Sequence, residues 1–272
     1  MAYKYKTKKA KRSNYGSKRS TSDIDWAVAH YTGNDGDTDE ANANYFANNN
    51  VGASAHYFID DDSVTQSVPD TYIAWAVGSY GLLDQGSPYA DEGAKYWGKC
   101  TNTNSISFEL CDTIDNNKLK CSKKTRANAA VFIAKKMYKY DIPISRLIRH
   151  FDVNGKLCPI YWVTDEEDWL KFKAEVNAEL KKLKNPYDVG KIYTLQYAMR
   201  VRTGAGTNYK QKKREELTES GKKNAKKGTY AKLKKGTKVK CQKTVVLKNG
   251  DIWMKIPSGY VCAKDKEKVY IK

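Results

Sequence analysis

The chain contains only three histidines, His30, His56 and His150, and each falls on a predicted strand or at the end of a predicted element. Cys158 follows His150 by eight residues. The Asn-Gly pair between them predicts a turn that can bring both side chains to one point. With His30 they form a set of two histidines and one cysteine, and three protein ligands that leave a fourth position open are typical of catalytic zinc. The alternative is a buried thiol beside two packing histidines.

Hydrophobic periodicity predicts the elements that must position these residues. Short apolar runs bounded by polar residues predict buried strands, and apolar residues at helical spacing predict amphipathic helices. We expect strands at Trp26–Tyr31, Ser54–Asp60 and Ser105–Cys111, and helices at Thr38–Asn50, Ser122–Tyr140 and Thr164–Leu183. Thr164 and Glu167 form a predicted capping box at the start of the last helix. Strands alternating with helices predict an α/β domain over residues 22–183.

The segments on either side of this domain differ from it in amino-acid composition. Residues 1–21 are rich in Lys, Ser and Tyr without an apolar period, which predicts a disordered basic arm. Residues 184–190 are expected to be a linker. Short β-rich runs separated by Gly and Lys then predict a small all-β barrel over residues 191–272, with a long lysine-rich loop at 210–229.

The net charge of +18 lies in these flanking segments. Residues 1–25 hold 8 Lys and Arg against 2 acids, and residues 184–272 hold 24 against 7, which leaves 17 against 22 for the segment between them. Such a concentration of charge favours a polyanionic partner, either nucleic acid, anionic lipid or an acidic wall polymer. Charge alone does not choose among the three.

Composition excludes several classes of protein. Mean hydropathy is −0.75, and no run approaches the roughly 18 apolar residues of a membrane span, so we expect no membrane insertion. The basic N-terminus has no apolar segment of the kind that export signals carry, so synthesis in a cytoplasm without a signal peptide is expected. Six cysteines without a CxxC pair predict free thiols rather than a disulfide framework.

Four ordered segments carry a family resemblance. They read AHYTG (29–33), SAHYFID (54–60), NSISFELC (104–111) and RHFDVNGKLCP (149–159). Together they resemble the zinc-dependent N-acetylmuramoyl-L-alanine amidases of the type-2 family, which are related to peptidoglycan recognition proteins. The resemblance covers roughly residues 22–182 and implies a central mixed β-sheet flanked by helices.

The resemblance also implies the roles of individual residues. His30, His150 and Cys158 would bind Zn²⁺, Glu109 would be the general acid/base, and Lys156 would lie over the developing oxyanion. Non-catalytic relatives typically lack the cysteine, so its presence favours hydrolysis. Physical chemistry agrees on Glu109, because a carboxylate in a mostly apolar strand is costly to bury without a task or a partner. The alternative is an edge position or an ion pair with a lysine.

Two further residues are expected to contact substrate or to support the pocket. His56 lies in the second segment of the resemblance, and we expect it in the pocket or just behind it. Trp75 begins the run Trp-Ala-Val-Gly, where relatives commonly show a Trp-His pair. This chain has Ala76 at the histidine position, which puts substrate contacts in doubt more than metal binding.

The C-terminal segment resembles a bacterial SH3-type cell-wall binding domain. The resemblance rests on MRVRTGAGTNY (199–209), LKKGTKV (233–239), GDIWMKI (250–256) and GYV (259–261). Its lysines are the candidates for contacts with an anionic wall polymer. The SH3-like barrel would then anchor the catalytic domain to its substrate.

We therefore expect a peptidoglycan hydrolase that cleaves the amide bond between the lactyl group of N-acetylmuramic acid and L-alanine. A wall hydrolase made without an export signal fits a phage endolysin that acts on the wall after release, and a host autolysin is the variant. One alternative is a non-catalytic muropeptide or cell-wall recognition protein. Nucleic-acid binding is a third interpretation, but it gives the acidic middle segment no role, so we expect no nucleic-acid partner. The sequence does not fix the oligomeric state.

Overall fold

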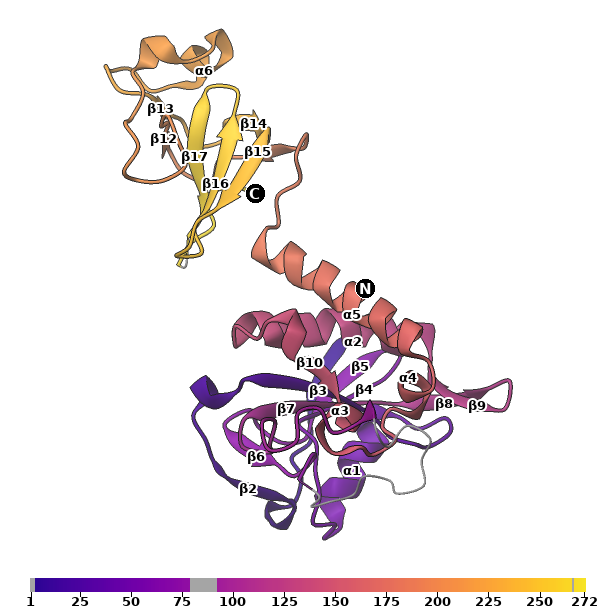
Figure 1. Ribbon diagram of the computed structural model, residues 1–272. Coiled ribbons are helices and arrows are strands. Elements are labelled where there is room, and N and C mark those ends of the chain that lie inside the picture. Colours follow the sequence, from indigo (N-terminus) through magenta and orange to yellow (C-terminus); the bar gives the residue numbers. More distant parts are fainter. Residues whose placement is uncertain (1–2, 79–91, 266) are drawn as a thin grey trace. The chain divides into compact units, whose positions relative to one another are not determined.

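The computed structural model describes residues 3–78, 92–265 and 267–272. The chain forms two compact units, residues 1–183 and 184–272, and Figure 1 colours them along the sequence. The expected domain boundary after residue 183 lies at this division. No helix in the described part of the chain has the length and the apolar character that crossing a membrane requires.

A six-stranded mixed sheet is the centre of the first unit. In spatial order its strands are β1 (Lys4–Thr7), β5 (Ser63–Gln66), β4 (Tyr57–Ile59), β7 (Ser105–Leu110), β3 (Trp26–Tyr31) and β10 (Leu147–Arg149). Neighbouring strands are parallel except β4 and β5, which are antiparallel. The three predicted strands are β3, β4 and β7, so the sequence located the middle of the sheet. The expected mixed sheet is confirmed.

Five α-helices belong to the first unit in its described residues. They are α1 (Asp39–Asn48), α2 (Lys123–Lys139), α3 (His150–Asn154), α4 (Ile160–Val163) and α5 (Glu166–Lys184). The side chains of Thr38 and Ser122 accept hydrogen bonds from the first-turn amides of α1 and α2, which is why these helices begin where they do.

The predicted capping box of the last helix is wrong. Asp165, rather than Thr164, accepts from the backbone N–H of Asp168 at 2.9 Å. Thr164 ends the short helix α4, and its hydroxyl donates to the carbonyl of Ile160 at 3.0 Å. A preceding helical turn that the periodicity did not reveal therefore moves the start of α5.

Side chains on the central strands alternate between two layers. Ala27 and Ala29 of β3 join Phe108 of β7 in the main core, which α2 and α5 cover. Because successive strand residues point to opposite faces, Val28 lies on the other side, where it packs with Val153 of α3. Figure 1 shows α2 and α5 on one side of the sheet and α1 on the other. A functional site at the ends of β3 and β7 would therefore lie on the face of the sheet opposite the main core.

A tight hairpin leaves the sheet after β7. Its strands are β8 (Asp112–Asp115) and β9 (Lys118–Cys121), joined by Asn116 and Asn117, which have φ values of 52° and 59°. Two successive residues with positive φ make the type I′ turn that favours asparagine and matches the twist of the strands.

The expectation of a disordered arm over residues 1–21 is wrong for the described residues. Strand β1 pairs in parallel with β5, and β2 (Tyr15–Lys18) pairs antiparallel with β6 (Tyr72–Ala74). Tyr15 is buried, with 1% of its surface exposed. The segment is ordered by backbone pairing and by a few anchoring side chains, and neither gives the apolar periodicity by which a sequence reveals order.

The second unit consists of short strands around its own core. The elements are β11 (Ile192–Thr194), β12 (Met199–Arg200), β13 (Lys232–Leu233), β14 (Lys238–Lys240), β15 (Lys243–Val246), β16 (Ile252–Ile256), β17 (Gly259–Lys264) and α6 (Glu219–Asn224). They form three small antiparallel sheets. The all-β character agrees with the expectation, whereas the SH3-type barrel remains a prediction.

Two expected irregular segments are built into this core. Tyr187, in the predicted linker, is buried, and its hydroxyl donates to the carbonyls of Ala263 and Ile271 at 3.0 and 2.9 Å. The predicted loop at 210–229 contains α6 and buries Leu217 and Ala225 in the core. The linker and the loop are therefore packed segments, and the loop contains no named strand, as expected. A few buried side chains hold them in place despite their polar composition.

Candidate metal centre

His30 and Glu109 lie side by side because of the register of the sheet. The parallel strands β3 and β7 pair His30 with Glu109, and β7 and β4 pair Glu109 with Phe58. All three residues lie on the face opposite the main core, at the carboxyl ends of parallel strands. Open α/β sheets commonly place their ligand sites at such ends.

The short helix α3 and the loop after it bring His150 and Cys158 to the same end of the sheet. Strand β10 pairs with β3 and is followed at once by α3, so His150 begins its helix next to the end of β3. Gly155 ends α3 with φ of 82°, a left-handed conformation that favours glycine. The N–H of Phe151 donates to the carbonyl of Cys158 at 3.0 Å and closes the loop.

The buried salt bridge below α3 fixes its orientation. Arg149 is 2% exposed, and its guanidinium donates to both carboxylate oxygens of Asp152, at 2.9 and 3.2 Å. The same guanidinium donates to Glu166 at 2.6 Å. A planar fork that binds several acceptors holds the backbone more rigidly than a single contact, so the position of His150 is preset.

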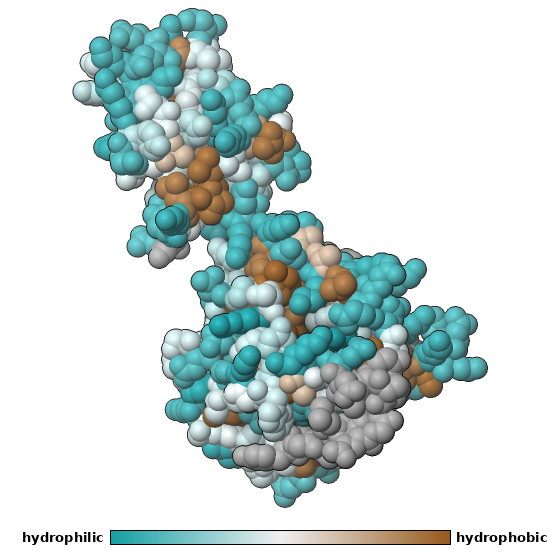
Figure 2. Space-filling view, in the orientation of Figure 1, coloured by the Kyte–Doolittle hydropathy of each residue, from teal (hydrophilic) through white to brown (hydrophobic). Residues whose placement is uncertain are grey.

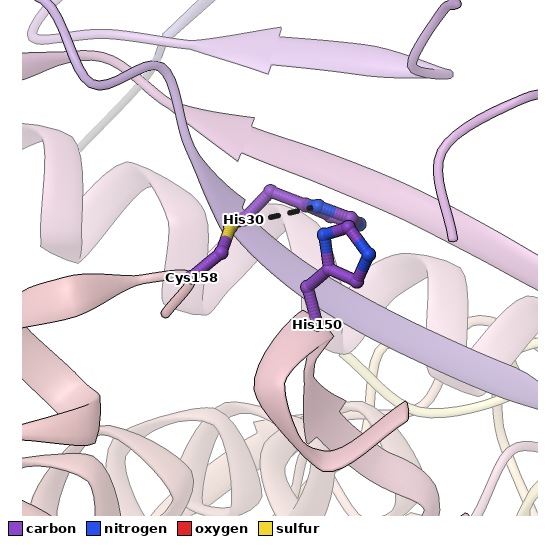
Figure 3. Close-up of side chains that lie close together, drawn as sticks. All are labelled: His30, His150 and Cys158. Atoms are coloured by element: carbon purple, nitrogen blue, oxygen red, sulfur yellow. Dashed lines mark hydrogen bonds between the residues drawn. The ribbon is translucent and has the colours of Figure 1, made fainter. Parts of the chain in front are cut away.

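These elements bring His30, His150 and Cys158 into one buried cluster, as the sequence predicted (Figure 3). One candidate ligand atom from each lies within 4.8 Å of the others. Cys158 Sγ is 3.8 Å from His30 Nδ1, and the two imidazole centroids are 4.7 Å apart. Within residues 3–78, 92–265 and 267–272, no other group of three or more His, Cys, Asp or Glu residues meets this spacing.

The donor set fits a zinc ion. Two imidazoles and a thiolate are preferred zinc ligands, and bonds of about 2.0 and 2.3 Å in a tetrahedron separate neighbouring ligand atoms by roughly 3.3–3.6 Å. His30 Nε2 and His150 Nδ1 are buried and have no hydrogen-bond partner among the described residues. The other nitrogen of His150 is 3.0 Å from Asn154 Nδ2, a contact that fixes the ring. Buried polar atoms normally have partners, so these orphan nitrogens indicate a missing one.

Burial sets the protonation of the cluster. Desolvation, with the nearby charges of His150 and Lys156, lowers the pKa of His30 well below its usual range. Desolvation and then Lys156 lower the pKa of His150 to about 3. Both imidazoles are therefore neutral at physiological pH, which is the form that binds metals. Burial raises the pKa of the Cys158 thiol well above its usual range, so its ionisation calls for a cation.

Glu109 and Lys156 flank the cluster. Glu109 Oε1 is 3.8 Å from His30 Nδ1, and its second oxygen is buried without a partner among the described residues. Burial raises the pKa of Glu109 to about 8, and Lys156 opposes this shift. Lys156 is exposed and lines the same cleft. Neither alternative for Glu109 holds among the described residues. Glu109 forms no ion pair with a lysine, and its strand β7 lies between β4 and β3 rather than at the edge of the sheet.

The cluster opens into a cleft of about 650 Å³. Trp75 lines it with 38% of its surface exposed, as an expected substrate contact should. Sequence reasoning missed a wall formed by α1 and the loop before it, which contributes Asn34, Asp37, Asn42 and Tyr45. The available signal was that Asn42 and Tyr45, three residues apart, lie on one face of the predicted helix at 38–50.

His56 does not line this cleft and so is not among the candidate substrate contacts; it lies behind the cleft, the second of the two positions expected for it. It is 1% exposed. Its Nδ1 is 3.0 Å from Ser107 Oγ, and its Nε2 is 2.8 Å from a guanidinium nitrogen of Arg19. His56 connects the N-terminal segment to β7 behind the site. The other six predicted site residues all line the cleft.

Comparison with known proteins gives the family. Residues 20–160, just over half of the chain, match the family model described as N-acetylmuramoyl-L-alanine amidase. The amidase CwlL of Bacillus licheniformis is 29% identical over 56% of this chain and 41% of its own length. The amidase CwlA of Bacillus subtilis is 30% identical over 67% of this chain and 60% of its own length.

A solved structure supports the fold alone. The hydrolase AmiA of Staphylococcus aureus, in complex with its ligand, is 18% identical with a TM-score of 0.51, covering 67% of this chain and 86% of that one. The chain spans less than half the length of the first curated relatives that it matches.

The fold and the buried cluster define an α/β domain with a candidate metal centre at the carboxyl end of its sheet. The chain belongs to the N-acetylmuramoyl-L-alanine amidase family.

Proposed function

We propose that this protein is a zinc-dependent N-acetylmuramoyl-L-alanine amidase that hydrolyses peptidoglycan. The observation that carries the proposal is the buried cluster of His30, His150 and Cys158 with Glu109 beside it, at the base of a cleft in a chain of this family. The bond cleaved is the amide between the lactyl carbonyl of N-acetylmuramic acid and the amino group of L-alanine. Water supplies an oxygen to the carbonyl carbon, and the alanine nitrogen leaves as an amine.

His30, His150 and Cys158 would hold the zinc ion. The chemistry that such an ion supplies is Lewis acidity, which activates water and polarises a carbonyl. These three protein ligands would leave one coordination position open for the reacting groups. The cluster is at most 4% exposed, so its neighbours act in a setting of low dielectric constant.

Glu109 is the residue in reach of the proton that must move. Its position beside His30 places a carboxylate at the edge of the cluster, with one oxygen that lacks a partner among the described residues. It would accept the proton of the attacking water and deliver it to the departing amine. Proton transfer by a positioned side chain contributes typically 10²–10⁴-fold to rate.

Lys156 would stabilise the charge that develops on the carbonyl oxygen. Its side chain lines the cleft on the loop between His150 and Cys158. A fixed cation near a developing oxyanion lowers the barrier because it interacts more strongly with the transition state than with the neutral amide.

The second unit would bind the wall. Residues 184–272 hold 24 Lys and Arg against 7 acids, and Figure 2 shows mostly hydrophilic side chains on the visible face of this unit. Its short antiparallel strands are compatible with the SH3-type wall-binding domain that the sequence resembles. Anionic wall polymers are the expected partner, and the lytic role would be that of an endolysin or an autolysin.

Digestion of purified Gram-positive walls tests the proposal. The expected products are glycan strands free of peptide and peptides with new L-alanine amino termini, lost with a chelator and restored by zinc. Glu109→Gln is the matched variant, since it keeps the metal ligands. A non-catalytic recognition protein would bind walls and release nothing in every arm. Fragments cut at another bond would refute the assignment.

A further inference from the structure

The second unit contains a cavity that the hydrolytic site does not use. It has a volume of about 390 Å³ and is lined by residues of β12, β13, β16 and β17. The lining includes Met199, Arg200, Arg202, Lys232 and Trp253. Its volume lies within the range of small-molecule and peptide-side-chain sites.

Arginine is concentrated at this cavity. Residues 184–272 contain 21 lysines but only three arginines, and two of those three, Arg200 and Arg202, line it. Arg200 is exposed, and its side chain forms no hydrogen bond or ion pair with any described residue. Arg202 uses one nitrogen to donate to the carbonyl of Tyr209 at 2.6 Å. A guanidinium matches planar anions with two parallel donors, whereas a lysine acts as a point charge.

The carboxylates that share the lining are already bonded within their own loops. Asp265 accepts from the hydroxyl of Tyr270 at 2.7 Å and from the N–H of Lys268 at 2.7 Å. Asp251 accepts from Asn249 Nδ2 at 2.9 Å. Neither forms an ion pair with the cations of the cavity among the described residues. The three cations of the lining, Arg200, Arg202 and Lys232, outnumber these two carboxylates, which leaves a small positive net charge.

Trp253 contributes to the apolar part of the cavity lining. It is 3% exposed, and its indole Nε1–H is buried with no acceptor among the described residues. Trp253 is also the only tryptophan in residues 184–272. Met199 and Cys262 complete the apolar part of the lining.

We propose that this cavity binds a peptide through a free carboxylate. Arg200 would hold the carboxylate with two parallel hydrogen bonds, and the peptide backbone would lie against Trp253. A peptide suits this lining better than a polyphosphate because the cavity has an apolar wall. A polyphosphate needs only cations, which the many surface lysines of this unit supply. The assignment of this peptide to the stem peptides of the bacterial wall rests on the proposed function. The existence of the peptide site does not depend on that function.

Titration of the ¹⁵N-labelled full chain tests the site. The probes are the peptide L-Ala-D-Glu-L-Lys-D-Ala, its fully amidated analogue and poly(glycerol phosphate). The indole N–H resonance of Trp253 reports on the cavity, while the five other tryptophans report on the first unit. We expect the free-acid peptide to shift Trp253 and the amidated analogue to shift it at least tenfold more weakly.

Three variants separate the guanidinium from general charge. Arg200→Gln and Arg200→Lys should each weaken the peptide about tenfold, because neither keeps the fork of donors. Lys248→Gln removes an exposed cation elsewhere in the unit and should change nothing. An equal response to the amidated peptide would overturn the proposal, and so would full binding by Arg200→Lys or a Trp253 response to poly(glycerol phosphate) alone.

The outcome is independent of wall hydrolysis. Hydrolysis without a Trp253 response to peptide would overturn the cavity site and leave the proposed function standing. A carboxylate-dependent Trp253 response without hydrolysis would support the site and remove its assignment to wall peptides.

Discussion

Arg19 should be the residue that makes the N-terminal segment part of the first unit. Its guanidinium reaches across the end of the sheet to the carbonyl of Ser105 at 2.6 Å and to His56 Nε2 at 2.8 Å. Weaker or more exposed contacts run to the carbonyls of Asn102 and Thr103 at 3.3 and 3.0 Å. Burial lowers the pKa of Arg19, as expected for a cation held partly away from water.

The cost of losing this side chain follows from the buried partners. Arg19→Met keeps most of the apolar stem but removes every donor. The exposed carbonyls can bind water instead. The carbonyls of Ser105 and Asp70 accept from Arg19 at 2.6 and 3.1 Å, and these two residues are at most 7% exposed, so both carbonyls lose a donor away from water. A hydrogen bond to a charged group contributes about 1.5–3 kcal/mol. Two lost contacts should therefore lower the free energy of unfolding of the first unit by about 3 kcal/mol.

Urea unfolding of the full chain measures this loss, with tryptophan fluorescence as the signal because five of six tryptophans lie in the first unit. Arg19→Lys should recover less than half of the stability, since one ammonium cannot replace the fork. Lys18→Met, at an exposed neighbouring position, is the control and should change the free energy by less than about 0.5 kcal/mol. A similarly small effect of Arg19→Met would refute the anchoring role and restore the disordered arm.

Three further predictions follow from the site. Cys158→Ser should reduce zinc from one ion per chain to near zero after dialysis, measured by elemental analysis, while wall binding stays intact; full zinc retention would contradict the ligand assignment. Glu109→Gln should retain zinc yet slow wall hydrolysis by about 10²–10⁴-fold, so wild-type turnover would exclude Glu109 as the acid/base. Burial, then Arg19, lowers the pKa of His56 to about 3 from its usual 6.5, so its stabilising contribution is complete above pH 6.5 and is lost as the pH falls towards 3. Between pH 6.5 and 4.5, the free energy of unfolding should therefore fall by about 2 kcal/mol less for His56→Gln than for wild type. Urea unfolding measures both decreases, and equal decreases would contradict the prediction.

The middle of the first unit was predictable because its residues obey local rules. Strand β3 begins and ends where the apolar run Trp26–Tyr31 does. Side-chain caps at Thr38 and Ser122 define helix starts. The candidate ligand cluster was predictable from ligand type and from the turn between His150 and Cys158, since a short loop constrains where two side chains can point.

The N-terminal segment was not predictable from composition. Its strand β1 pairs with β5, nearly sixty residues away in sequence, and leaves no apolar periodicity. The choice between the two positions expected for His56 was not predictable for a related reason. Its sequence neighbours resemble a motif, but its position behind the site depends on Arg19 and Ser107, which come from distant segments. The cleft wall from α1 was missed because polar residues on a helix do not reveal which cavity they face.

The most direct test of the central claim is the chemistry of the new ends formed in wall digests. Digestion by the zinc-loaded chain in water enriched with ¹⁸O should place one ¹⁸O atom in the lactyl carboxylate of muramic acid and none in the peptide, whose L-alanine amine becomes free. Mass analysis of glycan and peptide fractions resolves the two. Label at a peptide carboxyl or at a sugar reducing end would show that another bond is cut and would contradict the account.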